Sequence, residues 1–224
     1  MKILVAIPVY DGKLPVEVVR ALYDERTIAD KCGDEIRLQF LPSCSHAAMG
    51  RNQLAQYFVD SDCDRLVFLD ADVTFEPGSL VKVAHHSADF VGGAYRFKLE
   101  SESYPVGWIT DGRDLWSDKY GLIEVASLPG GFMSLSRKVF EDLRAAHPER
   151  HYEHFGKKAH CWFQMLFTDG HLYGEDSYFC KEWRDLGGKV YLDPELSLTH
   201  WDGTKSFAGH IGKWLKSRAA EVTA

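Results

Sequence analysis

Apolar residues fall into short runs along the first 96 positions, with longer amphipathic stretches between them. Four of the runs have the length of strands, at 3–9, 36–40, 66–69 and 90–95. Three stretches show helical spacing, at 15–33, 47–59 and 78–86. Because alternating strands and helices are joined by crossover connections, we predict an α/β fold with a mostly parallel central sheet flanked by helices. The first helix is expected to pack through Val16, Val19, Leu22 or Tyr23, and Ile28.

Beyond residue 96 the pattern is less regular. Residues 98–121 are polar and loop-rich, and 147–171 form a second irregular stretch. The remaining segments predict strands over 122–127 and 132–136, a helix from there to Leu143, a helix over 176–186, and strands near Val190 and Leu196. A last amphipathic segment carries Phe207, Ile211, Trp214 and Leu215. Since repeats and clear linkers are lacking, we expect a single domain over 1–224.

Composition narrows the class of protein. Of the 224 residues 45% are hydrophobic, which is enough for a sizeable core. A formal net charge of -7 argues against a broad nucleic-acid-binding surface. No apolar run approaches the roughly 18 residues of a membrane span, and the first residues are typical of an opening strand rather than a signal peptide. Five scattered cysteines without a CxxC pair suggest reduced thiols, so we expect a cytoplasmic location.

Two aspartates end a predicted buried strand. In RLVFLDADVTFEPGSL, residues 65–80, Asp70 and Asp72 follow the apolar run and precede the turn at Pro77-Gly78. An open α/β sheet binds its ligands beyond the carboxyl ends of its strands. Two carboxylates there can hold a hard cation such as Mg²⁺ or Mn²⁺, which bridges to the phosphates of a substrate. The alternative is a pair of solvated or helix-capping aspartates.

Glu175 and Asp176 precede a predicted helix. An aspartate at a helix N-terminus is favoured by the helix dipole alone, and the same position suits a general base near an acceptor hydroxyl. His200 closes a strand-like run. It is a metal-ligand candidate if the fold brings it to Asp70 and Asp72, and otherwise a hydrogen-bonded structural residue.

A glycine pair opens another apolar strand. Gly130 and Gly131 allow the backbone to approach a ligand closely, or they form a tight turn or bulge.

Together these segments resemble the GT-A-fold glycosyltransferases, most of all the family 2-like enzymes. The resemblance runs from residue 3 to about 203 and rests on five motifs in the same order. They are IPVY (7–10), GRNQLAQYF (50–58), FLDADV (68–73), LPGGFMSLSRKVFEDL (128–143) and GEDSYFCKEWRDLGGKVYLDP (174–194).

The resemblance implies a role for each motif. In that family the first motif lines the nucleobase pocket, the aspartate motif binds ribose and metal–diphosphate, and the Gly-Gly-Phe strand lies beside the donor sugar and acceptor. The implied contacts to the nucleotide sugar are Pro8, Tyr10, Arg51, Asn52, Asp70, Gly130, Gly131 and Lys205. Lys205 or His210 could close over the pyrophosphate as part of a lid.

The resemblance also implies the chemistry. Asp72, with His200 and Asp70, would hold Mn²⁺ or Mg²⁺ against the diphosphate. Asp176, with Glu175 beside it, would take the proton from the attacking hydroxyl, which gives inversion at the anomeric carbon.

The expected function is therefore a metal-dependent glycosyltransferase that moves a sugar from a nucleoside-diphosphate sugar to a hydroxyl of a carbohydrate or other acceptor. About 1–96 would form the nucleotide-binding half and about 97–224 the acceptor-binding half. Family 2 members commonly carry an aspartate that pairs with uracil after the second strand. Residues 41–46 contain no acid, which leaves the nucleobase open. The final amphipathic segment could form a homo-oligomer interface or pack on its own domain.

Other functions stay open at this point. VFLDADVT (67–74) matches the DxDxT pattern of haloacid-dehalogenase-type phosphatases, with Asp70 as nucleophile and Asp72 as general acid. That motif normally lies on the first strand of the core, whereas a strand-helix-strand-helix unit precedes it here. A nucleotidyltransferase of related fold would need a Gly-rich basic first loop, of which Asp11-Gly12-Lys13 is a thin version. A non-catalytic carbohydrate-binding protein would use the tryptophans and tyrosines.

A histidine-rich stretch, HYEHFGKKAHC (151–161), superficially suggests zinc. Its spacing fits no familiar zinc module, so we predict a solvated loop on the acceptor side.

Overall fold

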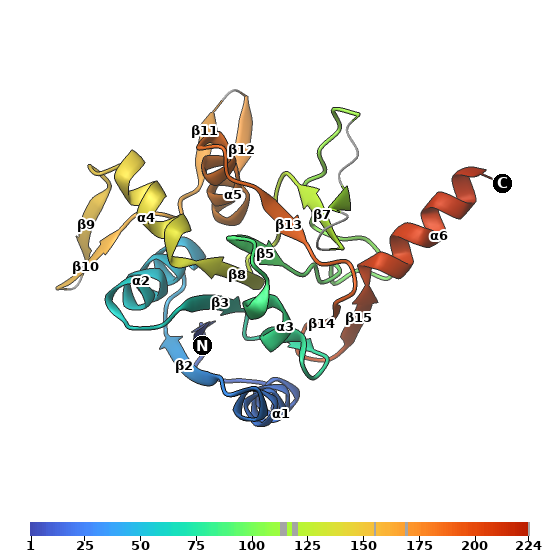
Figure 1. Ribbon diagram of the computed structural model, residues 1–224, viewed down its shortest axis with the longest axis horizontal. Helices are drawn as coiled ribbons and strands as arrows, with labels where there is room; N and C mark the ends of the chain where they lie inside the picture. The colour runs from blue at the N-terminus through green and yellow to red at the C-terminus, as the bar shows by residue number, and fades with distance from the viewer. Residues whose placement is uncertain (113–115, 118–120, 155, 169, 224) are drawn as a thin grey trace.

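The protein is described here by a computed structural model that covers residues 1–112, 116–117, 121–154, 156–168 and 170–223 (Figure 1). In this part of the chain an eight-stranded sheet has the order β2-β1-β3-β8-β5-β13-β7-β6. Its strands are β1 (Lys2–Val9), β2 (Glu35–Pro42), β3 (Arg65–Leu69), β5 (Phe90–Gly92), β6 (Trp116–Ser117), β7 (Leu122–Val125), β8 (Phe132–Ser136) and β13 (Val190–Leu192). Only β8 and β7 run against the common direction of the described strands. The predicted α/β fold with a mostly parallel sheet is confirmed.

The side chains of the central strands alternate between two hydrophobic cores. On β3, Leu66 and Phe68 face one core, whereas Val67 and Leu69 face the other. Successive residues of a strand point to opposite faces, so a continuous apolar run such as RLVFL marks a strand that is covered on both sides. The sheet is thereby the middle layer of three.

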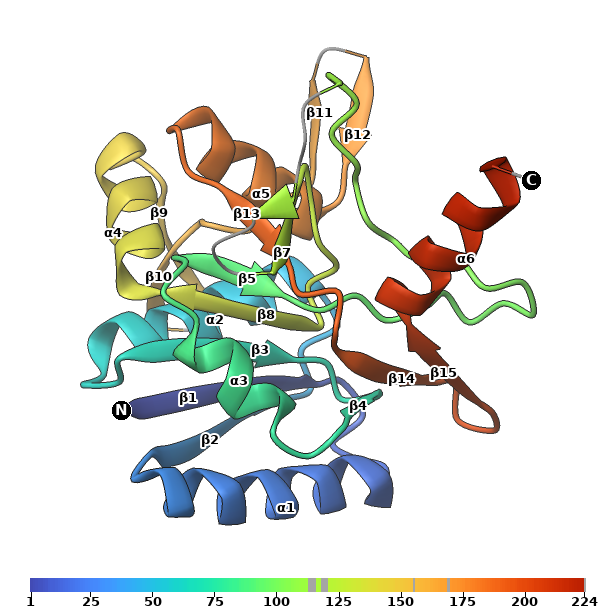
Figure 2. The ribbon, with the colours of Figure 1, turned by 45° about the vertical axis from the view of Figure 1, so that its right-hand side comes forward.

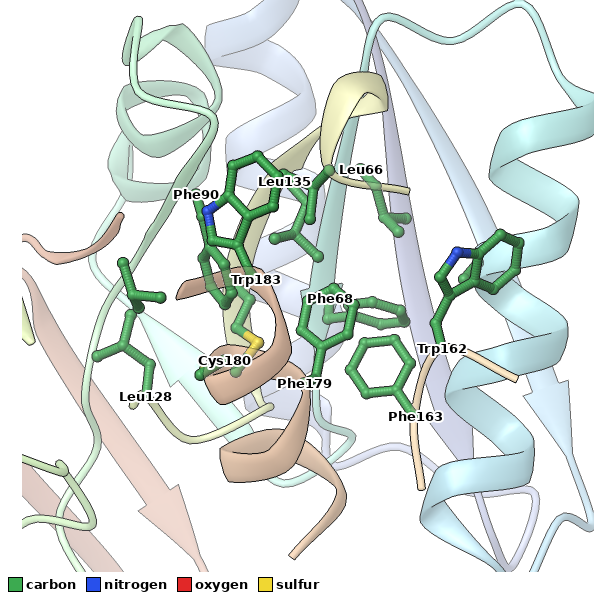
Figure 3. Close-up of a cluster of buried hydrophobic side chains, with 14 of the residues drawn as sticks. Leu66, Phe68, Phe90, Leu128, Leu135, Trp162, Phe163, Phe179, Cys180 and Trp183 are labelled. Atoms are coloured by element: carbon green, nitrogen blue, oxygen red, sulfur yellow. The ribbon is translucent and has the colours of Figure 1, made fainter. Parts of the chain in front are cut away.

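Helices form the two outer layers. α1 (Val16–Cys32) and α3 (Ser79–His85) pack on one face of the sheet. α2 (Ala47–Asp60), α4 (Arg137–Ala146) and α5 (Glu175–Asp185) pack on the other. Figure 2 shows α1 beside β2 and β1, with α4 and α5 at the far end of the sheet. The core covered by α2, α4 and α5 is rich in aromatic rings. Among them, Phe163 is stacked on Phe179 at 4.2 Å between ring centroids (Figure 3).

The predicted helix after Pro15 is confirmed, and the prediction of its buried face was right only in part. α1 buries Val18, Leu22, Glu25 and Ala29, with Ile28 packed beside them, and leaves Val16, Val19 and Tyr23 exposed. The buried residues follow helical spacing, and the unexpected member is Glu25. Its carboxylate is fully buried because it accepts hydrogen bonds from the backbone N–H groups of Gly78 (2.6 Å) and Val81 (2.7 Å) at the start of α3.

A second, three-stranded sheet was not predicted. It pairs β4 (Val73–Phe75) with β14 (Ser197–Trp201), and β14 with β15 (Ser206–His210). β14 runs antiparallel to β4, with His200 opposite Val73. The last amphipathic segment spans two elements, because Phe207 lies on β15 and Ile211 begins the helix α6 (Ile211–Thr223). Pairing over a separation of more than 120 residues leaves no local signal in so short a strand as β4.

The stretch 147–171 was predicted to be irregular, and this was wrong. β9 (His151–His154) and β10 (Lys157–His160) form one hairpin, and β11 (Leu166–Thr168) pairs with β12 (His171–Tyr173) in another. Neither hairpin shows a clean apolar face, which hides such strands from a periodicity analysis. The described residues contain no group of three or more His, Cys, Asp or Glu side chains placed to hold a metal ion, at this hairpin or elsewhere.

Two further expectations concern the loop-rich segment 98–121 and the lack of a membrane-spanning segment. Within 98–121, residues 113–115 and 118–120 lie outside the described part, and 116–117 form β6. No helix in the described ranges is long and apolar enough to cross a bilayer.

Candidate active site

The candidate site is a cleft of about 780 Å³ at the carboxyl ends of β1 and β3. Its lining includes Pro8 and Tyr10 after β1, Arg51 from α2, and Asp70, Asp72 and Lys98. Crevices at this edge are where open α/β sheets bind ligands. The sheet topology thus brings together the first three motifs of the sequence.

Asp70 is held in a fixed orientation. Arg51 Nη2 donates a hydrogen bond to Asp70 Oδ1 at 2.9 Å, and the Tyr95 hydroxyl donates to Oδ2 at 3.2 Å. Burial alone would lower the pKa of the Arg51 guanidinium. The negative charges of Asp70 and Glu175 outweigh this effect, so the pKa of Arg51 is raised above its usual value. The repulsion expected between two neighbouring aspartates is thus offset at Asp70 by a buried cation.

The glycine pair makes this arrangement possible. Arg51 Nη1 donates to the carbonyl oxygen of Gly130 at 3.1 Å, and a Cβ on Gly130 would lie 2.6 Å from Arg51 Cζ. A Cβ on Gly131 would lie 2.5 Å from Asp70 Oδ2. Both positions require glycine because the backbone of this segment packs directly against the two charged side chains. Gly130 and Gly131 form a turn, as the structural alternative expected, and this turn lies close to two charged side chains of the protein.

Asp72 lies at the next turn of the chain and faces a different set of groups. Lys98 Nζ is 2.6 Å from Asp72 Oδ2, and His200 Nε2 is 3.4 Å from the same oxygen. Burial alone would raise the pKa of Asp72, but hydrogen bonds from His200 and Lys98 lower it to about 2. The pairing of β4 with β14 is what places His200 here, as the sequence required for a ligand role.

The orientation of His200 suits a metal ligand. Its Nδ1 lies 3.0 Å from the carbonyl oxygen of Arg96, which can only accept a hydrogen bond. Nδ1 therefore carries a proton. When Nε2 is protonated as well, it donates to Asp72, whereas in the neutral ring its lone pair faces the carboxylate. A lone pair that faces a carboxylate needs a cation or a proton between them. A carboxylate oxygen and an imidazole nitrogen backed by a carbonyl are donors that Mn²⁺ accepts, so these two residues fit a divalent metal. Asp70, whose two oxygens already bind Arg51 and Tyr95, fits less well.

Glu175 and Asp176 begin α5 on the other side of Arg51. Glu175 Oε1 is 3.7 Å from Arg51 Nε. Asp176 accepts hydrogen bonds from the backbone N–H groups of Ser177 at 2.7 Å and Gly130 at 3.2 Å. The second, third, fourth and fifth motifs therefore meet around Arg51. The two roles considered for Asp176, a residue favoured by the helix dipole and a general base, are compatible with each other, because the start of the helix fixes its carboxylate.

Two predicted contact residues lie elsewhere. Asn52 turns away from the cleft: its Oδ1 accepts from the N–H groups of Trp162 and Phe163, and its Nδ2 donates to the carbonyl of Phe163. Lys205 pairs with Glu100 and lies over the ring of Phe207, 5.2 Å from its centroid. The structure gives Asn52 a structural part, and neither residue lines the cleft in this conformation.

Sequence reasoning missed Lys98 and Tyr95. Tyr95 connects the two aspartates, because its hydroxyl binds Asp70 while its ring packs on His200 at 4.6 Å between centroids. Burial raises the pKa of Tyr95 well above its usual value. Lys98 follows in a polar stretch that carries no motif. Tyr95 is the last residue of the strand predicted over 90–95 and Lys98 follows it closely, so the available signal was that this strand ends at the same sheet edge.

Comparison with known proteins defines the class of fold. No family model matches the sequence, and no curated protein sequence matches it. Among solved structures the chain matches GT-A glycosyltransferases over most of its length at low identity. The chain therefore has the GT-A fold that its motifs suggested.

Three of the matches are specific enough to describe. The catalytic domain of Drosophila beta-1,4-galactosyltransferase 7, in complex with xylobiose, matches with a TM-score of 0.50 and 16% identity, over 94% of this chain and 70% of that one. A variant of the same enzyme, in complex with manganese, UDP-Gal and xylobiose, matches with a TM-score of 0.50 and 14% identity over the same shares. GalNAc-T7 with UDP, GalNAc and Mn²⁺ matches with a TM-score of 0.52 and 13% identity, over 92% of this chain and 46% of that one. At such identities the likeness concerns the fold alone.

Proposed function

We propose that the protein is a metal-dependent glycosyltransferase that moves a sugar from a nucleoside-diphosphate sugar to an acceptor hydroxyl. The observation that supports this most is the arrangement around the cleft. Asp72 and His200 lie 3.4 Å apart on one side of Tyr95, where together they would hold a metal ion, and Asp70, Arg51 and Glu175 form a charge network on the other. Two of the matching structures are complexes with manganese and with UDP-Gal or UDP.

The donor would bind in the cleft with its diphosphate near Asp72. In this proposal Asp72 and His200 hold Mn²⁺ or Mg²⁺, which when bound neutralises charge on the departing nucleoside diphosphate. Lys98 and Lys13 lie along the same cleft and would bind phosphate oxygens directly. The exposed ring of Tyr10 and the neighbouring Pro8 would lie against the base. Asp70, fixed by Arg51 and Tyr95, would accept a hydrogen bond from the ribose.

The acceptor would approach from the side of α5, within the half of the chain after residue 96. Asp176 is the proposed general base, and its two backbone hydrogen bonds hold the carboxylate in one orientation. The proton of the attacking hydroxyl would pass to Asp176 as the bond from the hydroxyl oxygen to the anomeric carbon forms and the bond to the diphosphate breaks. A single displacement of this kind inverts the anomeric carbon. Glu175 would act indirectly, by its ion pair with Arg51.

The binding step can be tested by thermal-shift titration with UDP, GDP, CDP and dTDP, each with and without Mn²⁺. A ligand present at a hundred times its dissociation constant adds about 2.7 kcal/mol to the free energy of unfolding, a readable shift. We expect one diphosphate to stabilise the protein only with the metal, and Asp72→Ala to abolish that effect.

Asp142→Ala is the matched control, because Asp142 is an aspartate on the distant helix α4 whose carboxylate pairs only with Lys138 among the described residues. It should leave the nucleotide-dependent shift intact. If no diphosphate stabilises the protein and a phosphate ester is hydrolysed with Asp70 required, the phosphatase alternative replaces this proposal.

A further inference from the structure

A second cavity lies away from the candidate active site. It has a volume of about 620 Å³ and is formed by the C-terminal half of α2, by α4 and by the β9–β10 hairpin (Figure 1). It shares no lining residue with the Asp70–Asp72 cleft. Gln56 and Asp60 of α2 line the cavity. Asp60 lies about 13 Å along the helix from Arg51, which lines the Asp70–Asp72 cleft. The roles proposed above leave this cavity unexplained.

The floor of the cavity presents polar atoms that lack partners. His160 is only 2% exposed, and its Nδ1 has no hydrogen-bond partner among the described residues. The Nε atom of Arg144 is also buried and unpartnered within the described part of the chain. Buried polar atoms are rarely left unsatisfied, and a guanidinium N–H can only donate. The Nε–H of Arg144 therefore lacks an acceptor, and Nδ1 of His160 can donate to the same acceptor in the tautomer that places the ring proton there.

The neighbouring protein groups do not supply that acceptor. Arg144 Nη2 and the backbone N–H of His160 share the single oxygen Gln56 Oε1, at 3.4 and 3.3 Å. The buried carboxylate of Glu182 is bound by Arg150 at 2.7 Å. Arg144 lies over the face of Trp162, with 5.0 Å from the guanidinium to the ring centroid. Arg144 thus has no carboxylate counter-ion among the residues that the structure describes.

The positive charges around His160 also favour an anion at the floor of the cavity. Burial, together with the positive charges of Arg144, His151, Arg150 and His147, lowers the pKa of His160 to about 4. The floor is an environment in which an additional positive charge is unfavourable. A negative charge placed there would be stabilised.

The rim of the cavity has a different character. It consists of exposed side chains of both signs and of neutral polar groups: Asp60, His151, Glu153 and Lys158. The cavity is also within the size range of small-molecule sites, well above what one phosphate ion fills. A ligand that suits both parts has one anionic group for the floor and hydroxyl groups for the rim.

We propose that this cavity binds a small hydroxylated anion, such as a sugar phosphate or a sugar acid, with its anionic group on Arg144 and His160. The site is distinct from the donor cleft and does not depend on the function proposed above.

The test is isothermal titration of the intact protein with glucose 6-phosphate, glucuronate, inorganic phosphate and glucose. We expect binding of glucose 6-phosphate or glucuronate, which separates phosphate from carboxylate recognition, and none of glucose. Arg144→Gln should weaken the binding roughly tenfold or more, because charge-assisted hydrogen bonds are lost. Lys157→Gln is the matched control, since Lys157 lies next to Lys158 on β10 but does not line the cavity.

The proposal is overturned if neither sugar anion binds at millimolar concentration, or if Arg144→Gln binds as the wild type does. Loss of binding in Asp72→Ala would also overturn it, because the ligand would then lie in the donor cleft. Far-UV circular dichroism checks that Arg144→Gln folds. If it does not fold, His160→Gln replaces it in the comparison, and unchanged binding in that variant contradicts the proposal.

Discussion

At Asp72 a lysine lies where a metal ion would come close. Lys98 Nζ is 2.6 Å from the carboxylate, and two cations that share one carboxylate repel each other. Entry of a divalent ion would therefore push Lys98 away, toward the diphosphate in the proposed complex. The same contact keeps the acidic pair tolerable without a metal.

Lys98→Ala is expected to tighten Mn²⁺ binding in the absence of nucleotide by about threefold to tenfold, since a repelling charge is removed. Calorimetric titration with Mn²⁺ alone measures this. Lys205→Ala serves as the control, because Lys205 pairs with Glu100 and lies outside the cleft lining. Weaker Mn²⁺ binding in Lys98→Ala would contradict the assignment of Asp72 as a ligand.

Gly131 limits the other aspartate. In Gly131→Ala the new Cβ would lie 2.5 Å from Asp70 Oδ2 and 2.7 Å from the Tyr95 hydroxyl, so the carboxylate would have to move off Arg51. We expect a loss of about 1–3 kcal/mol in the free energy of unfolding, together with weaker nucleotide binding. Urea denaturation and the thermal-shift titration measure the two effects.

The matched substitution is Gly50→Ala on α2, where the nearest atom would lie 3.5 Å away in ordinary contact. It should stabilise the helix or be neutral. Equal losses in both variants would show that the clash at Asp70 is not the cause.

At the scale of elements, α1 and α3 are joined by one buried carboxylate. Gly78, the residue before α3, provides no side-chain cap, and Glu25 of α1 accepts the free N–H groups instead. Burial raises the pKa of Glu25, and the backbone hydrogen bonds oppose that rise. The cap of one helix thus comes from the buried face of another.

Glu25→Gln should lower the free energy of unfolding by about 1–3 kcal/mol, because an amide leaves one of the capped N–H groups facing a donor. Glu17→Gln, on the exposed side of the same helix, changes the same chemical group without a buried partner and should have little effect. Urea denaturation of both variants distinguishes them. Similar stabilities would mean that the two N–H groups find other acceptors.

These elements also show what could be predicted. The strands with continuous apolar runs, β1 and β3, were recovered because both of their faces are buried. The helix α1, which lies between β1 and β2, was recovered with its ends, because Pro15 and Gly33 mark them, the latter with a φ of 75°. Its buried face was recovered only in part, because a buried glutamate is understood only once α3 is in place.

At the site, the family resemblance implied that Asp72 and His200 would come together. The structure shows why: β4 and β14 pair, although neither strand was expected to form that sheet. The sequence did not predict Lys98 or Tyr95 as site residues, because each belongs to the site only through a contact to a residue distant in sequence. Asn52 illustrates the opposite case, in which a motif residue supports a neighbouring segment instead of the cleft.

At the scale of the whole molecule, the sheet separates two cores, and several polar side chains are buried among the described residues. His160 is one of these. A histidine in an unfolded chain titrates near pH 6.5, and burial lowers the pKa of His160 to about 4 in the folded protein. Between these two values the unfolded chain takes up a proton that the folded chain does not. The free energy of unfolding therefore falls as the pH falls through this window.

From pH 7 to pH 5, His160→Gln should lose about 1–2 kcal/mol less stability than the wild type, because the glutamine does not titrate. Urea denaturation at both pH values measures the difference. His171→Gln, a change at an exposed histidine of the β11–β12 hairpin, should keep the pH dependence of the wild type. A parallel decline in wild type and His160→Gln would contradict the buried, neutral state of His160.

The measurement that tests the central claim most directly is cleavage of nucleotide sugars, followed by mass spectrometry of the released nucleoside diphosphate. A panel of UDP-, GDP-, CDP- and dTDP-sugars would be incubated with the wild type and with Asp72→Asn and Asp142→Asn, with Mn²⁺ or with a chelator. The account predicts that one base class releases its diphosphate, with the metal and Asp72 both required and Asp142→Asn unaffected. Release that is equal in Asp72→Asn, or hydrolysis of simple phosphate esters in place of any nucleotide sugar, would contradict it.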